Sequence, residues 1–214
     1  MSPEFTYSEL LPVGPDTTKY RSLGTEGVRT LKVGELEFLE IAPEAIEKLT
    51  STAIADISHY LRAEHLQQLA DILKDPEASP NDRFVALDLL KNANIAAGGV
   101  LPMCQDTGIA VVFLKVGMNV KWDAKMSVTE MVNEGVRRAY NHPDNKLRAS
   151  VLLDPAGKRT NSKDNTPAVI HYEIGEGDGV EMNCAAKGGG SENKSKMVML
   201  NPSDSIVDWV VKTV

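Results

Sequence analysis

Apolar residues recur at three- and four-residue steps over residues 43–99, a spacing that indicates consecutive amphipathic helices. The first helix begins at Pro43, the second ends at Asp75, and the third opens with the capping residue Ser79 and stops at Gly98. The apolar positions that define these periods are Ile46, Leu49, Ala53, Ile57, Leu61, Leu66, Leu69, Ala70, Leu73, Phe84, Leu87, Leu90 and Ile95. Three such helices in succession predict an antiparallel helical layer.

Alternating and continuous apolar stretches predict the strands. Residues 28–41 alternate weakly around a Gly-Glu pair, which favours a short hairpin with a type II′ turn. Residues 109–116 are a continuous apolar run, typical of a strand buried on both faces. Residues 168–174 and 180–186 flank a glycine-rich turn, so we expect them to pair as an antiparallel hairpin.

The remaining segments are read from composition and capping signals. Residues 1–27 have no period and predict a surface arm, and the polar residues 157–167 predict a mobile connection. Residues 127–130 form a capping box that opens a helix ending near Tyr140. A last amphipathic helix within residues 201–214 is still in phase at its final residue, so we expect a truncated, N-terminal piece of a longer protein.

These elements define an α+β fold, with an N-terminal helical layer followed by a mostly antiparallel sheet with packing helices. We expect an N-terminal arm and short hairpin in residues 1–42 and a domain in residues 43–214. That domain divides into the helical layer of residues 43–99 and a mixed α/β part of residues 100–214.

Composition narrows the partners and the compartment. The formal net charge of −7 argues against a nucleic-acid binder, which needs a cationic face. Two cysteines in 214 residues suit a reducing compartment with free thiols. No apolar run approaches the length of a membrane span, and the N-terminal residues lack secretory or transit features, so we expect a cytoplasmic protein with a mitochondrial location still open.

Two loops carry candidate chemistry. Cys104, Gln105 and Asp106 place a thiol, an amide and a carboxylate just before a predicted strand. They indicate either a reactive site or a loop with one buried cysteine and a turn-forming aspartate. No histidine or cysteine lies at zinc-like spacing from Cys104, which argues against a zinc site.

The second loop contains Gly188, Gly189 and Gly190 between Lys187 and Lys194. Successive glycines let backbone N–H groups approach an anion, although a flexible hairpin end is an equal alternative. A nucleotide P-loop requires a glycine immediately before its lysine, and an asparagine precedes this one.

Cys184, the histidines and Arg148 are further candidates for site residues. Cys184 is in phase with Val180 and Met182 on a predicted strand, which favours a core position. The four histidines lie on helical or strand patterns that favour structural or solvated roles. Arg148 follows a helix end, where it is either solvated or within reach of a bound carboxylate.

The motifs Cys104-Gln-Asp-Thr-Gly108 and Ala186-Lys-Gly-Gly-Gly-Ser-Glu-Asn-Lys194 follow the stretch Ile95-Ala-Ala-Gly-Gly-Val-Leu-Pro102 in the chain. In this order they resemble class I fumarate hydratases, the iron–sulfur hydro-lyases to which tartrate dehydratases are related. The resemblance covers nearly the whole chain, and it implies a homodimer whose substrate is a small dicarboxylate.

The resemblance also implies a cofactor and a set of site residues. Cys104 matches the first of three cysteines that hold a [4Fe–4S] cluster, and the other two lie beyond this sequence. One thiolate does not hold a cluster, so we expect this piece alone to lack the cluster and turnover. Gln105 and Asp106 match residues that contact the substrate, with Asp106 catalytic. Arg148 and the Gly188–Gly190 loop also match substrate-binding positions.

The expected reaction is the reversible hydration of fumarate to malate, completed by the remainder of the protein's own chain. Dehydration of tartrate is the first alternative. The second is an anion- or nucleotide-binding module that uses the Gly188–Gly190 loop. We expect Cys104, Asp106 and that loop to line one concave surface, and we expect no nucleic-acid partner and no membrane partner.

Overall fold

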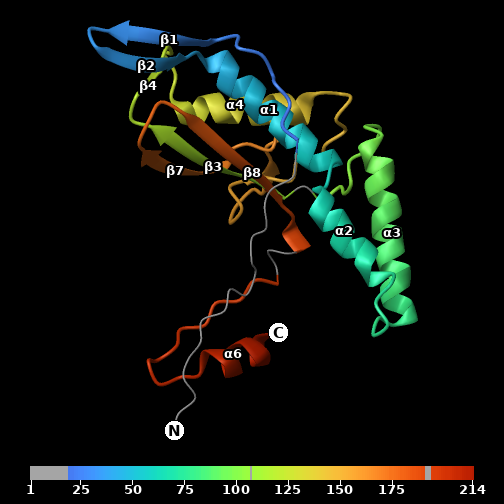
Figure 1. Cartoon of the computed structure of the whole chain (residues 1–214). Coiled ribbons are helices and arrows are strands. Elements are labelled where there is room, and N and C mark those ends of the chain that lie inside the picture. Colours follow the sequence, from blue (N-terminus) through green and yellow to red (C-terminus); the bar gives the residue numbers. More distant parts are fainter. Residues whose placement is uncertain (1–18, 107, 191–193) are drawn as a thin grey trace.

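The computed structural model describes residues 19–106, 108–190 and 194–214. Figure 1 shows helices and strands mixed along the chain, which confirms the α+β class. Most of the predicted arm, residues 1–18, lies outside the described residues. The elements are β1 (Val28–Val33), β2 (Leu36–Ile41), α1 (Pro43–His59), α2 (Ala63–Ile72), α3 (Pro80–Ala97), β3 (Ile109–Gly117), β4 (Val120–Trp122), α4 (Val128–Asn141), β5 (Leu152–Leu153), β6 (Thr160–Asn161), β7 (Val169–Gly175), β8 (Val180–Lys187) and α6 (Ile206–Thr213).

The predicted N-terminal hairpin is present. Strands β1 and β2 pair antiparallel, with Val33 opposite Leu36. Of the two loop residues between them, Gly34 has a positive φ of 63°, as the first position of a type II′ turn requires. Strand β4 adds to β2 in parallel, so this small sheet is mixed.

The central sheet has the strand order β7-β3-β8, which corrects the predicted hairpin of residues 168–174 and 180–186. Strand β3 lies between them, parallel to β7 and antiparallel to β8. Sequence spacing favoured a hairpin because it reports only on neighbours in the chain. The central position of β3 pairs both edges of this apolar strand, which an end position would not do.

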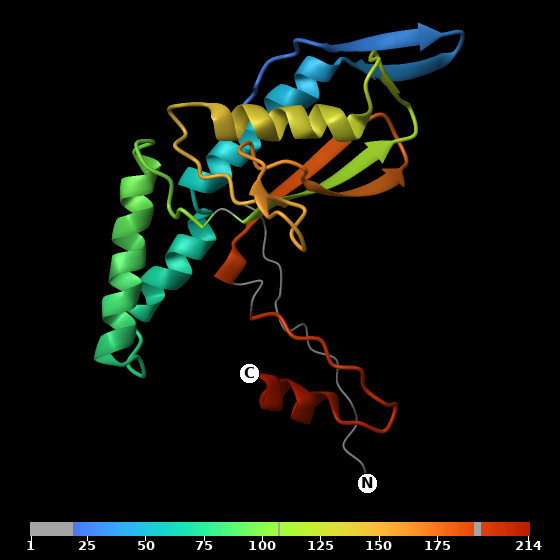
Figure 2. The same ribbon diagram turned by 180° about the vertical axis from the view of Figure 1, so that it is seen from behind.

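Helices α1 and α4 cover one face of this sheet (Figure 2). Ala110, Val112 and Leu114 of β3 are at most 1% exposed on that face. The two helices pack closely because α4 has Gly135 where a larger side chain would collide with Thr50 of α1. The same packing buries Ile54, Met131, Val132 and Val136, together with Cys184 in part.

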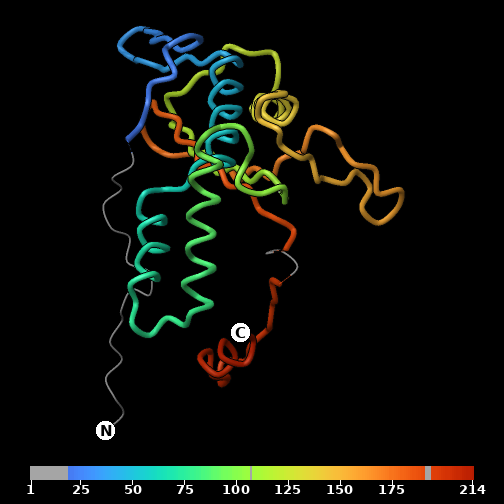
Figure 3. Tube along the Cα trace, turned by 90° about the vertical axis from the view of Figure 1, so that its right-hand side faces the viewer, coloured from blue at the N-terminus to red at the C-terminus, as the bar shows by residue number. Residues whose placement is uncertain are grey.

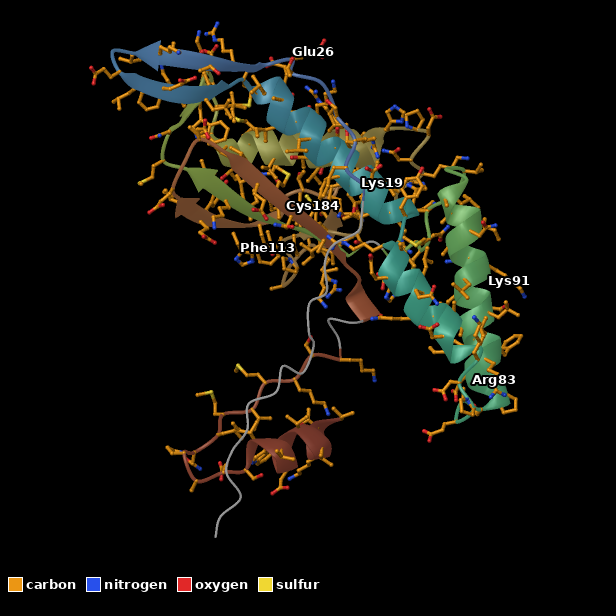
Figure 4. The ribbon with its side chains drawn as sticks, viewed as in Figure 1. Lys19, Glu26, Arg83, Lys91, Phe113 and Cys184 are labelled. Carbon is orange, nitrogen blue, oxygen red and sulfur yellow. The ribbon has the colours of Figure 1, made fainter. Side chains whose placement is uncertain are left out.

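The opposite face of the sheet is open, so the expected burial of β3 on both faces was wrong. The side chain of Phe113 is 50% exposed and stacks on His171 at a centroid distance of 4.8 Å. Figure 4 places Phe113 on the side of the sheet away from the helices. Lys115 and Glu173 form an ion pair of 3.0 Å on the same face, which gives this surface a mixed polar character.

Helices α2 and α3 pair with each other beside the main body, as the tube in Figure 3 shows. Helix α3 begins as predicted, because Ser79 and Asp82 form a reciprocal capping box. Its apolar positions do not form a core, since Phe84 is 63% exposed and Ile95 is 62% exposed. Its buried residues are small, namely Ala86, Ala93 and Ala96.

Residues 164–166 are anchored to the domain, so the predicted mobile connection is wrong for this part of residues 157–167, whereas residues 157–161 are exposed. Asn165 is completely buried, and Asp164 pairs with Arg137 of α4 at 3.1 Å. Burial raises the pKa of Asp164, but the hydrogen bonds from Thr166 and Arg137 outweigh it, and the pKa is lowered overall. Residues 164–166 are therefore a structural part of the domain.

The final segment carries the predicted helix α6, which begins after Ser205 because that side chain accepts a bond from the Asp208 N–H. None of the α6 residues is buried, and the helix lies apart from the sheet in Figures 1 and 2. Among the described residues, no helix is long and apolar enough to cross a membrane.

Candidate active site

The loop that contains Cys104, Gln105 and Asp106 connects α3 to β3 and is fastened to the helices at its start. The Met103 N–H donates to the Ser58 carbonyl at the end of α1, at 2.9 Å. The side-chain amide of Asn92, on α3, donates to the Met103 carbonyl at 2.8 Å. These contacts present the next three residues on the surface, where each is exposed.

Asp106 connects this loop to the glycine loop. Its carboxylate oxygens accept hydrogen bonds from the N–H groups of Gly189 at 3.1 Å and Gly190 at 3.2 Å. The bonds from Gly190 and Gly189, and more weakly the charge of Arg148, hold the pKa of Asp106 below its ordinary value. Asp106 is therefore an ionised hydrogen-bond acceptor at neutral pH.

Gly108 is the point at which the two loops touch. Its φ is 56°, and a Cβ atom at this position would collide with the carbonyl of Lys187. Glycine is therefore required both by the backbone conformation and by the close approach. Gly188 is less restricted, since a Cβ there would lie in tight contact with the Asp106 carbonyl oxygen, at 3.0 Å.

The two cysteines lie in different environments. Cys104 is exposed, and its sulfur accepts the Asp106 N–H at 3.3 Å. Cys184 contacts both buried apolar clusters, and burial raises the pKa of its thiol to about 11. The core-facing position predicted for Cys184 is confirmed. Figure 4 shows Cys184 within the body of the domain.

The structure thus brings Asp106 together with Cys104 and the glycine loop, while Gln105 lies exposed between Cys104 and Asp106. Arg148 stands on the neighbouring segment, which Ser150 ties to the Gly108 carbonyl. Their roles in chemistry stay predictions. The part of the glycine loop that continues through residues 191–193 lies outside the described residues.

An iron–sulfur cluster needs several thiolate ligands, so the metal-binding side chains of the site decide whether it fits. Among the described residues, no group of three His, Cys, Asp or Glu side chains could hold a metal ion. Cys104 is an accessible thiol, whereas Cys184 is committed to the core. These residues alone do not fit a cluster that needs three thiolates.

Sequence reasoning missed the polar residues that support the site from behind. Ser150 and Asn165 both donate side-chain hydrogen bonds to the Gly108 carbonyl, at 2.8 Å and 3.0 Å. Asparagine in a polar stretch usually indicates an exposed turn, so no pattern distinguished this one. The positive φ of several residues in the segment is likewise invisible in the sequence.

The fold and the site can now be compared with known proteins. The family model for fumarate hydratase (Fumerase) matches residues 47–214. This chain belongs to the fumarate hydratase family. The resemblance drawn from the two loop motifs is thereby confirmed, and both loops lie within the matched residues.

Individual members of the family are also similar to the chain. It is 41% identical to the aerobic class I fumarate hydratase of Escherichia coli (strain K12) over 191 residues, which cover 89% of this chain and 34% of that protein. The mitochondrial fumarate hydratase 1 of Leishmania major is 38% identical over 207 residues, 93% of this chain and 37% of that protein.

A putative L(+)-tartrate dehydratase subunit alpha of Methanocaldococcus jannaschii is 35% identical over 133 residues, 61% of this chain and 46% of that protein. The chain spans about a third of the length of the fumarate hydratases that it matches.

Proposed function

We propose that this chain is the N-terminal portion of a class I fumarate hydratase, which adds water reversibly to fumarate to give malate. The observation that carries the proposal is the contact between Asp106 and the N–H groups of Gly189 and Gly190. It joins the two family motifs into one surface that holds a carboxylate in a fixed position. Membership of the fumarate hydratase family supports a hydro-lyase.

Each site residue has a role that follows from its chemistry. The ionised Asp106 accepts a hydrogen bond from the hydroxyl of malate and so orients the bond that breaks on dehydration. Arg148, whose charge acts on Asp106, binds a substrate carboxylate with its planar guanidinium. The exposed amide of Gln105 donates to the same substrate.

The glycine loop acts mainly through Asp106. The N–H groups of Gly189 and Gly190 already donate to that carboxylate, so they fix its position and keep it ionised. The same contacts weigh against the nucleotide-binding alternative, because a phosphate would compete with Asp106 for these donors. Gly188 lets the backbone pass close to Asp106 and keeps the surface open to a substrate.

Cys104 supplies one thiolate to a [4Fe–4S] cluster in the complete enzyme, and the remainder of the protein's chain supplies the other two. Such a cluster would supply Lewis-acid chemistry for loss of the substrate hydroxyl, and Cys104 is the residue of this chain that would hold it. The exposure of Cys104 beside Asp106 supports this assignment, and the burial of Cys184 argues against its use as a ligand. The 214-residue chain alone is accordingly inactive.

The complete enzyme acts as a homodimer in the cytoplasm or the mitochondrion, as a reducing compartment protects exposed thiols. The similarity to a mitochondrial fumarate hydratase supports a mitochondrial location. Tartrate is a second candidate substrate, supported by the similarity to a putative tartrate dehydratase subunit. Turnover of fumarate, malate and L(+)-tartrate by one preparation separates the two.

The experiment compares two cysteine variants in a full-length enzyme that carries this region, reconstituted with iron and sulfide without oxygen. Cys104→Ala should abolish the visible absorbance of the cluster and the hydratase activity, whereas Cys184→Ala should keep both. A Cys104→Ala enzyme that still binds the cluster would exclude this thiol as a ligand. Tight ATP binding by the 214-residue chain would instead favour the nucleotide-binding alternative.

A further inference from the structure

A completely buried asparagine joins three parts of the chain directly behind the site. The side chain of Asn165 is 0% exposed, and its oxygen accepts the N–H groups of Ser150 at 2.7 Å and Val151 at 3.1 Å. Its nitrogen donates to the Gly108 carbonyl at 3.0 Å. One amide therefore connects the Gly108 end of the Cys104 loop to the segment that contains Arg148.

The Gly108 carbonyl is held from two sides. The Ser150 hydroxyl donates to it at 2.8 Å, so the two lone pairs of this oxygen are both used. Gly108 itself contacts the carbonyl of Lys187, immediately before the glycine loop. The three segments that carry the proposed site residues thus meet at one peptide group.

The asparagine is fixed in turn by α4. The neighbouring Asp164 accepts a hydrogen bond from Arg137 at 3.1 Å, and the Ala168 N–H donates to the buried side chain of Asn133 at 2.9 Å. Asn165 has a φ of 60°, a left-handed conformation that asparagine tolerates better than most residues. A rigid helix therefore determines where the amide of Asn165 lies.

Arg148 stands two residues before Ser150, on the segment that the amide holds. Gly108 stands two residues after Asp106, so the amide ties the segment of Arg148 to the segment of Asp106. Without the Asn165 amide, the segment of Arg148 would still be bound to Gly108 by the Ser150 hydroxyl. The position of the Arg148 guanidinium relative to Asp106 would then be less well fixed. Position matters here because a small displacement of a binding group lowers kcat/KM steeply.

We infer that Asn165 is a positioning residue, which sets the location of Arg148 relative to Asp106 and so tunes binding of the dicarboxylate substrate. It touches no substrate and acts through its hydrogen bonds to Gly108, Ser150 and Val151. The inference deepens the proposed function and rests on it for the identity of the substrate.

The test is a double-mutant cycle between Asn165 and Arg148 in the full-length enzyme. Asn165→Asp keeps the acceptor and the tolerance for positive φ, but places an oxygen against the Gly108 carbonyl. We expect kcat/KM for malate to fall by at least about tenfold, chiefly through KM. In an Arg148→Ala background the same change should cost less than about threefold, because the group that it positions is gone.

Ser162→Ala is the matched control. Ser162 belongs to the same segment, and its buried hydroxyl has no hydrogen-bond partner within the part of the chain that the structure describes. It should leave kcat/KM unchanged in both backgrounds. Ser150→Ala is a second variant that buries no charge, and it should reproduce the Asn165 effect more weakly, again only when Arg148 is present. Circular dichroism and urea midpoints verify that each variant is folded.

Equal losses in both backgrounds would overturn the inference, because a merely structural role lowers activity regardless of Arg148. Wild-type kcat/KM in both Asn165→Asp and Ser150→Ala would overturn it as well. Absence of any hydratase activity in the wild-type enzyme would instead refute the proposed function. In that case amide hydrogen exchange decides: Asn165→Asp, which loses the bond to the Gly108 carbonyl, must speed exchange within residues 104–106, and unchanged exchange there refutes the inference.

Discussion

Replacement of Gly108 by alanine should be one of the most damaging small changes in the chain. Two separate costs apply at this position. A residue with a Cβ atom pays about 1–2 kcal/mol for the left-handed conformation that a φ of 56° imposes. The added methyl group also collides with the backbone carbonyl of Lys187, and forced displacement of packed structure costs about 1–3 kcal/mol more.

Gly99 provides the matched control for this prediction. Its φ is 71°, but a Cβ atom there would have no neighbour within 4 Å. Gly99→Ala therefore carries only the conformational cost of about 1–2 kcal/mol, whereas Gly108→Ala should lower the free energy of unfolding by about 2–5 kcal/mol. The difference between the variants isolates the collision between the two loops.

Urea unfolding of the 214-residue chain, followed by circular dichroism, measures both values. With a slope of about 3 kcal/mol per molar urea, a loss of about 3 kcal/mol moves the midpoint down by about 1 M. Equal midpoints for the Gly108→Ala and Gly99→Ala proteins would refute the close approach of the loops. A changed slope would indicate a changed folded or unfolded state rather than a simple loss of stability.

Three further outcomes follow from the described contacts. Cys104 should react with a thiol reagent at pH 8 in the folded chain. Cys184 should react only on unfolding, because a pKa of about 11 leaves about one thiolate in a thousand at that pH. Equal labelling rates of the two cysteines would contradict the assigned environments. Asp106→Asn should lower the free energy of unfolding at neutral pH. Because the folded pKa of Asp106 is lowered, the difference between wild type and variant should vanish as the pH falls through that pKa. Urea midpoints across pH measure this difference, and a difference independent of pH would show that ionisation is not involved. Phe84→Ser and Ile95→Ser should each change the free energy of unfolding of this chain by no more than about 0.5 kcal/mol, because both residues are over 60% exposed. A loss above about 1.5 kcal/mol in urea unfolding would show that these side chains are packed against another part of the protein.

The local parts of the fold were predictable, because their signals lie within a few residues of the element they control. Pro43, Ser79 and Ser127 each mark the start of a helix through its first-turn hydrogen bonds or its backbone angles. The hairpin of β1 and β2 was predictable for the same reason, since a two-residue loop with glycine restricts the turn type.

The non-local parts were not predictable. A continuous apolar run in β3 indicates burial but does not say which strands flank it, and the order β7-β3-β8 depends on segments far along the chain. Cys104 and Asp106 were candidates because a thiol and a carboxylate share one loop, and motif order then linked them to a family. The contact of Asp106 with the glycine loop, and the support from Asn165, depend on how distant loops pack, which no periodicity encodes.

The central place of β3 also has a consequence for the order in which the molecule is made. Val111 pairs with Val169 and Ile109 pairs with Lys187, so both partners of β3 leave the ribosome long after β3 itself. The nascent chain must therefore hold an apolar, unpaired strand while α1, α2 and α3 already form from local contacts. Because Cys104 and Asp106 directly precede this strand, they reach their final positions only when β8 has been synthesised.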